Sequence, residues 1–314
     1  MRSTTVCFRA LSSSKPTSFA VVRRAFFVLP PLCFPAGFVV VAPFGRFAPS
    51  TDSIFLLDGI RSWILMEIVA PIAFLYALAN TPLASSPADV APLAPAPLFF
   101  AALFLAHYAN RALLSPLRSP SRSKSHVSVV LPGIVFNIVN GTLIATYLRS
   151  PTAFAFLAGS LTRPTFWAGT ALWAAGFVGN ILHDEVLLNI RRNAKAKGKA
   201  KAKSDDEDDS DSDRPRKKPS REHYGIPHGY LYAHVSYPNY LCEWVEWFGF
   251  ALAAAPVPDV TSLGALVASV QPPWIFFFSE VCLMFGRAYR GHRWYLKNFP
   301  DYPKDRKAVV PYVI

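Results

Sequence analysis

Residues 128–148 read SVVLPGIVFNIVNGTLIATYL, a run that contains no Asp, Glu, Lys or Arg. A helix needs roughly 20 mostly apolar residues to cross the hydrocarbon core of a membrane. The run meets this requirement, so we predict that it spans a membrane. Two amides interrupt it, Asn137 and Asn140, and polar side chains inside a span are candidates for function because burying them is costly.

The rest of the chain repeats this pattern of long apolar runs separated by charged patches. Of its 314 residues, 52% are hydrophobic and 17% are charged, whereas about one quarter of the residues in soluble domains are charged. We therefore predict an all-α, polytopic membrane protein with about seven transmembrane helices and a cofactor pocket on the cytosolic side. The predicted spans are residues 25–44, 62–81, 97–116, 128–148, 165–190, 239–255 and 272–289.

The positive charge of the chain indicates contact with lipid and not with nucleic acid. The net charge is +12, but the basic residues lie beside apolar segments, where Lys and Arg set orientation and meet anionic head groups. The connections after predicted spans three and five and the C-terminal tail are the basic ones, so we predict that these segments are cytosolic. Seven spans would then place the arginines of the N-terminus on the opposite side, which does not fit this rule.

Composition divides the chain into four parts. Residues 1–24 form an N-terminal tail, predicted to be disordered, whose first fifteen residues also resemble a mitochondrial presequence. Residues 25–192 hold five predicted helices, and 221–314 hold the last two with a C-terminal cofactor-binding segment. Between them, residues 193–220 contain a Lys/Ala tract, an acidic tract and a second basic cluster. Such a sequence buries too little apolar surface to fold, so we predict a disordered, charged, cytosolic insert.

Neither a metal nor a common nucleotide-binding motif is indicated. The four cysteines are scattered, with no pair at the spacing of a zinc site, and we predict neither a disulfide framework nor a metal site. The chain has no GxGxxG motif after a strand and no P-loop. A nucleotide would therefore have to be held by arginines, whose planar fork suits phosphate oxygens.

Polar residues inside the predicted spans supply candidates for catalysis. Glu67 lies in span two, and Tyr108 lies in span three beside His107 and Arg111. A carboxyl group in apolar surroundings tends to stay protonated. A neutral Glu67 and the Tyr108 hydroxyl group could then both donate hydrogen bonds to a carbonyl oxygen, which polarises an enone because charge builds on that oxygen when the β-carbon is attacked.

The C-terminal third resembles the steroid 5α-reductase family. The matching segments begin at Tyr224 (YGIPHGYLY), Val235 (VSYPNYLCE), Glu246 (EWFG) and Arg293 (RWYLKNFPDYPKDRKAVVP). Upstream matches are Trp63-x-Leu-x-Glu67, His107-Tyr108-x-x-Arg111, Asn140-Gly141 and Asn180-Ile181-x-x-Asp184. The resemblance therefore extends from the second predicted span to the end of the chain, apart from the insert.

The resemblance implies a seven-helix reductase of the endoplasmic reticulum membrane that uses NADPH on a lipophilic, steroid-like substrate. It implies that Glu67 and Tyr108 hold the substrate ketone, with Trp63 and Arg111 also at the substrate. The implied cofactor contacts are Asn180, Asp184, Arg191, Tyr224, Asn239, Glu243, Arg287, Tyr295 and Arg306. The preference for NADPH over NADH rests on the family and on the arginines available for a 2′-phosphate.

Two positions depart from the family pattern. Cys242 stands where the family has glycine before a glutamate, and Gly291 stands where a cofactor-contacting histidine is expected. Both departures concern details of nucleotide contact.

The leading hypothesis is reduction of the C4–C5 double bond of a 3-oxo-Δ4 steroid or sterol-like enone. The first alternative is a trans-2-enoyl-CoA or polyprenol reductase on the same scaffold. A membrane methyltransferase and a non-catalytic sterol sensor are the others. The presence of both Glu67 and Tyr108 argues against the sensor.

Overall fold

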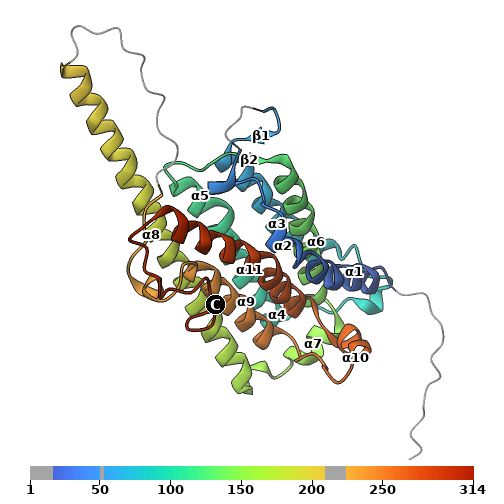
Figure 1. The fold of residues 1–314 in the computed structure, drawn as a ribbon. Helices are drawn as coiled ribbons and strands as arrows, with labels where there is room; N and C mark the ends of the chain where they lie inside the picture. Colours follow the sequence, from blue (N-terminus) through green and yellow to red (C-terminus); the bar gives the residue numbers. More distant parts are fainter. Residues whose placement is uncertain (1–16, 50–52, 209–223) are drawn as a thin grey trace, which may run out of the picture.

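The computed structural model describes residues 17–49, 53–208 and 224–314, with only the backbone of residues 199–208. The described residues form a bundle of helices (Figure 1), and the one sheet among them has two short antiparallel strands, β1 (Leu56–Leu57) and β2 (Ser125–His126). The prediction of an all-α protein is confirmed.

The chain enters the bundle through a broken helix. Helix α1 (Ser18–Cys33) begins earlier than the predicted span at 25, and α2 (Ala36–Val39) and η1 (Gly45–Phe47) follow Pro35. Arg23, expected in the tail, lies inside α1, where it is buried and donates to the carbonyl groups of Ala268 and Val270. These carbonyls lie at the end of α10 (Leu263–Ser269) and just beyond it, so Arg23 satisfies groups that a helix end leaves unpaired.

Helices α3 (Gly59–Asn80) and α6 (Val127–Leu148) pack closely against each other. Asp58 begins α3 by accepting from the backbone N–H groups of Ile60 and Arg61. Where the two helices meet, a Cβ atom on Gly141 would lie 2.4 Å from the carbonyl oxygen of Ala70. Only glycine permits this approach, as is common where helices pack within membranes.

The third long segment changes its winding in the middle. Helix α4 (Pro95–Tyr108) continues as the π-helix η3 (Ala109–Leu114) and ends as α5 (Ser115–Arg118). A π-helical turn holds an extra residue, so side chains beyond it point in other directions than in a continuous α-helix. Tyr108 and Arg111 lie at this change. The short helix η2 (Pro87–Asp89) lies in the connection from α3 to α4.

The second half begins with α7 (Pro151–Leu157), η4 (Ser160–Thr162) and α8 (Pro164–Asp208). Helix α8 extends away from the bundle (Figure 1), so the insert predicted to be disordered is helical up to Asp208. Its Lys/Ala tract explains this continuation, because both residue types favour helices. The rest of the insert, like residues 1–16 of the N-terminal tail, lies outside the described residues.

After the insert follow η5 (Tyr230–Ala233), α9 (Pro238–Ala254) and α11 (Pro272–Asn298). The C-terminal segment returns to the start of α9, where the backbone N–H groups of Ser236 and Tyr237 donate to the carbonyls of Lys307 and Ala308 at 2.9 and 3.0 Å. This pairing fixes the residues just before α9 against the tail.

The number of seven spans is not confirmed. Among the described residues, four helical segments have the length and hydropathy to cross a membrane: Ser18–Val39, Gly59–Asn80, Pro95–Arg118 and Val127–Leu148. Helices α10 and α11, bent by 116° at their junction, count as a fifth if taken together. Helix α9 has 17 residues, fewer than the roughly 20 that a span needs.

Candidate active site

An apolar cavity lies among α1, α3, α4, α6 and α11. Its volume is about 740 Å³, which is within the range of small-molecule sites. Apolar side chains form most of its wall, among them Phe26, Leu29, Met66, Val135, Phe136, Phe276 and Met284. The cavity is therefore suited to a lipophilic molecule.

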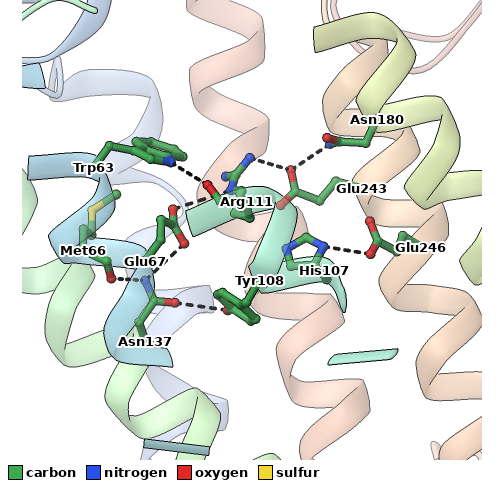
Figure 2. Close-up of polar contacts among 10 residues, drawn as sticks. All are labelled: Trp63, Met66, Glu67, His107, Tyr108, Arg111, Asn137, Asn180, Glu243 and Glu246. Atoms are coloured by element: carbon green, nitrogen blue, oxygen red, sulfur yellow. Dashed lines mark hydrogen bonds and ion pairs between the residues drawn. The ribbon is translucent and has the colours of Figure 1, made fainter. Parts of the chain in front are cut away.

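Three polar side chains meet at one wall of this apolar cavity. The Tyr108 hydroxyl group donates to Oδ1 of Asn137 at 3.2 Å, and Nδ2 of Asn137 donates to the Met66 carbonyl at 2.7 Å (Figure 2). The same Nδ2 lies 3.5 Å from Oε2 of Glu67. Asn137 thus joins the two residues that were predicted to hold a ketone, and both are buried, with 7% of Glu67 and 2% of Tyr108 exposed.

Arg111 connects this group to a second carboxylate. Its Nε lies 3.5 Å from Oε1 of Glu67, and its Nη1 lies 3.3 Å from Oε2 of Glu243 on α9 (Figure 2). The indole N–H of Trp63 donates to the backbone carbonyl of Arg111 at 3.2 Å. Glu67 is therefore not the isolated carboxyl group that the sequence suggested, because it shares one guanidinium group with Glu243.

A second buried polar pair lies behind this group. Nδ1 of His107 lies 2.8 Å from Oε1 of Glu246, and Glu246 is completely buried. The ring of His107 also packs edge-on against Trp247, with centroids 4.7 Å apart. This pair ties α4 to α9 directly behind Tyr108.

A second cavity of about 260 Å³ shares a wall with the first. The residues that line both are Ala42, Phe44, Trp63, Arg111, Ser125, Leu283 and Arg287. We call the second space the arginine cavity, because its described lining includes Arg46, Arg111, Arg122, Arg191, Arg287 and Arg290, and Asp184 as its one acidic residue.

The charges of the arginine cavity are only partly balanced. Within the part of the chain that the structure describes, Nη1 of Arg46 and Nη1 of Arg290 are buried without a hydrogen-bond partner. Burial, together with the Arg191 and Arg111 guanidinium groups, lowers the pKa of Arg122 to about 10, so Arg122 remains charged at neutral pH. The cavity is thus suited to a ligand that carries several negative charges, such as a phosphorylated dinucleotide.

The predicted cofactor residues fall into two groups. Those that line the arginine cavity are Asp184, Arg191, Tyr224, Asn239 and Arg287. Those that lie outside its lining are Asn180, Glu243, Tyr295 and Arg306.

The second group supports the first from behind. Nδ2 of Asn180 contacts the Asn239 carbonyl at 3.0 Å and Oε2 of Glu243 at 3.3 Å, and Nδ2 of Asn239 donates to Asp184 at 3.0 Å. Arg306 is buried and donates to the carbonyl of Pro227 at 3.0 Å. Trp63 and Arg111, predicted at the substrate, line both cavities.

Four residues of these cavities were not singled out as site residues by the sequence. Arg46 and Tyr237 line the arginine cavity, and so does Arg290, which the sequence indicated only as an orienting charge. Glu280 lines the apolar cavity. An acidic residue in a predicted span was a usable signal for Glu280, whereas nothing local marked Arg46 or Tyr237.

No metal centre is visible in the described part of the chain, where no three His, Cys, Asp or Glu side chains are grouped to bind an ion. The three cysteines that the structure describes are free.

Comparison with known proteins identifies relatives along most of the chain. Residues 210–314 match the family model described as 3-oxo-5-alpha-steroid 4-dehydrogenase. An uncharacterised protein of Schizosaccharomyces pombe is 36% identical over 90% of this chain and 94% of its own length. The 3-oxo-5-alpha-steroid 4-dehydrogenase 1 of Bos taurus is 30% identical over 90% of this chain and 92% of its own length. The corresponding protein of Mus musculus is 30% identical over 86% and 84%. The chain therefore belongs to the 3-oxo-5-alpha-steroid 4-dehydrogenase family, the steroid 5α-reductases.

Proposed function

We propose that this chain catalyses the NADPH-dependent reduction of the C4–C5 double bond of a 3-oxo-Δ4 steroid or a sterol-like enone in the endoplasmic reticulum membrane. The single observation that carries this proposal is the shared wall of the two cavities. One cavity is apolar and ends at Glu67, Tyr108 and Asn137, the other is lined by arginines, and Trp63 and Arg111 belong to both. A lipophilic acceptor and an anionic donor can therefore meet there.

In this proposal the arginine cavity holds the dinucleotide phosphates. Arg46, Arg122, Arg191 and Arg290 would contact them, and Asn239 and Asp184 would position the adjoining groups. When bound, NADPH supplies the hydride that adds to C5, and a proton from solvent adds to C4, so one NADPH and one proton are consumed for each double bond. The unpartnered Nη1 atoms of Arg46 and Arg290 are the donors that such a ligand would satisfy.

The protein groups act on the ketone oxygen of the substrate. The Tyr108 hydroxyl group can turn from Asn137 to donate to that oxygen, because both groups border the same cavity. Charge develops on the oxygen during reduction, and a donor already in place stabilises this charge most. Wall residues such as Phe136 and Met284 would exclude water from the reacting carbons.

Charge counting indicates how Glu67 can also donate. Arg111 is the cation within ion-pair distance of both Glu67 and Glu243. One guanidinium group neutralises one carboxylate, and a second negative charge inside an apolar cavity is costly. We infer that the two carboxyl groups hold one proton between them. With this proton on Oε1 or Oε2 of Glu67, that residue becomes the second donor to the ketone.

The test is NADPH oxidation by the full-length chain, purified in detergent, with three substrates assayed separately: a 3-oxo-Δ4 steroid, a trans-2-enoyl-CoA and a polyprenol precursor. Deuterium from the labelled C4 position of NADPH should appear at C5 of the steroid in the mass spectrum of the product. Turnover of only the thioester or the polyprenol would overturn the substrate class. No oxidation with any substrate would overturn the reductase and would favour the methyltransferase or the sensor.

Glu67→Gln serves as the variant in the same assay. Glutamine keeps the shape and an N–H donor but cannot hold the shared proton, so kcat should fall by about 100-fold, a typical loss for one donor to a developing oxyanion. The Kd of NADPH should change less than about threefold, because Glu67 lines the apolar cavity and not the arginine cavity. An unchanged kcat would exclude Glu67 from the reaction.

A further inference from the structure

Gly291 has no room for a side chain because Tyr237 occupies the space. A Cβ atom built on Gly291 would lie 1.6 Å from the Tyr237 hydroxyl oxygen and 2.3 Å from its Cζ. Gly291 is buried in α11, one residue after Arg290 and one helical turn after Arg287, and both of these arginines line the arginine cavity. The Tyr237 hydroxyl group therefore stands where a larger residue at 291 would begin.

The position of Tyr237 is fixed by its backbone and its ring. Its N–H donates to the Ala308 carbonyl at 3.0 Å, and it directly precedes Pro238, the first residue of α9. Its ring packs against Tyr240 with centroids 5.1 Å apart. A residue held at both ends of its side chain is preorganised for a ligand.

The hydroxyl group of Tyr237 faces the arginine cavity and is free to bind. Tyr237 lines this cavity, and its hydroxyl group has no hydrogen bond to any residue that the structure describes. Burial raises the pKa of Tyr237, so the phenol keeps its proton at neutral pH and can donate.

Arg46 lies beside the same hydroxyl group in an aromatic surrounding. Its guanidinium carbon is 4.5 to 5.7 Å from the ring centroids of Tyr224, Tyr237, Trp294 and Tyr295. These rings favour the cation and restrict its motion, but they leave its Nη1 without a hydrogen-bond partner in the described structure. Arg46 and Tyr237 together present a charged donor and a neutral donor to one side of the cavity.

We propose that Tyr237 takes the place of the histidine that is missing at position 291 and, together with Arg46, forms a phosphate-binding subsite for the dinucleotide. This inference rests on the proposed function. It explains both features as one exchange: the hydroxyl group of Tyr237 supplies the hydrogen-bond donor, and glycine at 291 is the one residue that leaves space for it.

The test measures the Kd of NADPH for the full-length chain in detergent, by the change in cofactor fluorescence on binding. Tyr237→Phe should weaken binding about tenfold, because one hydrogen bond to a charged phosphate is lost while the ring remains. Gly291→His should weaken it by more than about 30-fold, because its imidazole and Tyr237 cannot share the space. The double variant Tyr237→Gly with Gly291→His should recover to within about threefold of the wild type.

Controls separate this role from a loss of folding. Gly198→Ala, with open space around its Cβ, should leave the Kd and the thermal unfolding temperature unchanged. Tyr147→Phe removes a hydroxyl group that is bonded to the Ala254 carbonyl, away from both cavities, and should also leave the Kd unchanged. Each Tyr237 or Gly291 variant is scored together with its unfolding temperature. The kcat of Tyr237→Phe at saturating NADPH should match that of the wild type.

Two results would overturn the inference and can be told apart. A wild type that binds no NADPH would overturn the proposed function and this subsite with it. A wild type that binds NADPH, with Tyr237→Phe unchanged or with the double variant no tighter than Gly291→His alone, would overturn only the subsite.

Discussion

Replacing Tyr108 by phenylalanine would remove one oxygen atom from the polar wall of the apolar cavity and leave the ring packing intact. That ring packs against Phe104, with centroids 4.7 Å apart. The lost group is the donor to Oδ1 of Asn137 at 3.2 Å. Asn137 keeps its bond to the Met66 carbonyl at 2.7 Å, so the two helices should remain in place.

The two effects of Tyr108→Phe differ in size. Leaving the buried oxygen of Asn137 unpaired should lower the free energy of unfolding by about 1–3 kcal/mol. Loss of a donor to a developing oxyanion lowers kcat by about 100- to 1,000-fold. Because Glu67 remains as a second donor, we expect the lower end, about 100-fold, with the Kd of NADPH within about twofold of the wild type.

Steady-state NADPH oxidation with a 3-oxo-Δ4 steroid gives kcat and KM, and thermal unfolding in the same detergent gives the stability. Tyr147→Phe is the matched control, because it also deletes a buried hydroxyl group on a bundle helix and leaves an acceptor, the Ala254 carbonyl, unpaired. It should lose a similar stability and keep its kcat. A Tyr108→Phe enzyme within about threefold of the wild-type kcat, or one no slower than the control, would refute the role of Tyr108.

Two further variants probe the arginine cavity and the helix contact. Arg122→Met should weaken NADPH binding by about tenfold at low salt and less at high salt, since it removes a cation whose Cζ is 3.6 Å from the Trp63 ring centroid; a Kd with unchanged salt dependence would contradict this. Gly141→Val should lower stability by about 1–3 kcal/mol, measured by thermal unfolding, because its Cβ would meet the Ala70 carbonyl at 2.4 Å; Gly198→Ala is the control, and an equal loss there would contradict the close contact.

Much of the apolar framework was predictable because it depends on composition. A membrane helix shows itself by a continuous apolar run, and three of the predicted spans match helical segments that can cross a membrane, Gly59–Asn80, Pro95–Arg118 and Val127–Leu148. The fourth such segment, Ser18–Val39, was predicted about seven residues late. Its start carries Arg23, whose charge argued for a tail. A charge is tolerated there because carbonyl groups from the other end of the chain accept its hydrogen bonds.

The candidate site was predictable where one residue type inside an apolar run was unusual in itself. Glu67, Tyr108 and Arg111 are of this kind, and the structure places them around one cavity wall. The role of Asn137 as the link between Glu67 and Tyr108 depends on how α6 faces α3 and α4, which the order of residues does not reveal. Arg46 is harder still, because the aromatic rings around it come from positions 224–295.

The π-helix η3 accounts for the way one segment serves both cavities. Tyr108 ends the α-helical part and borders only the apolar cavity, whereas Arg111, three residues later, borders both. The extra residue of a π-helical turn leaves backbone carbonyls poorly paired, and here the Trp63 indole satisfies that of Arg111 at 3.2 Å. Trp63 also lines both cavities. The wall between donor and acceptor is therefore built from a strained turn and the side chain that stabilises it, so Trp63→Phe should impair cofactor and substrate binding together, which separate measurements of the Kd of NADPH and the KM of the steroid would show.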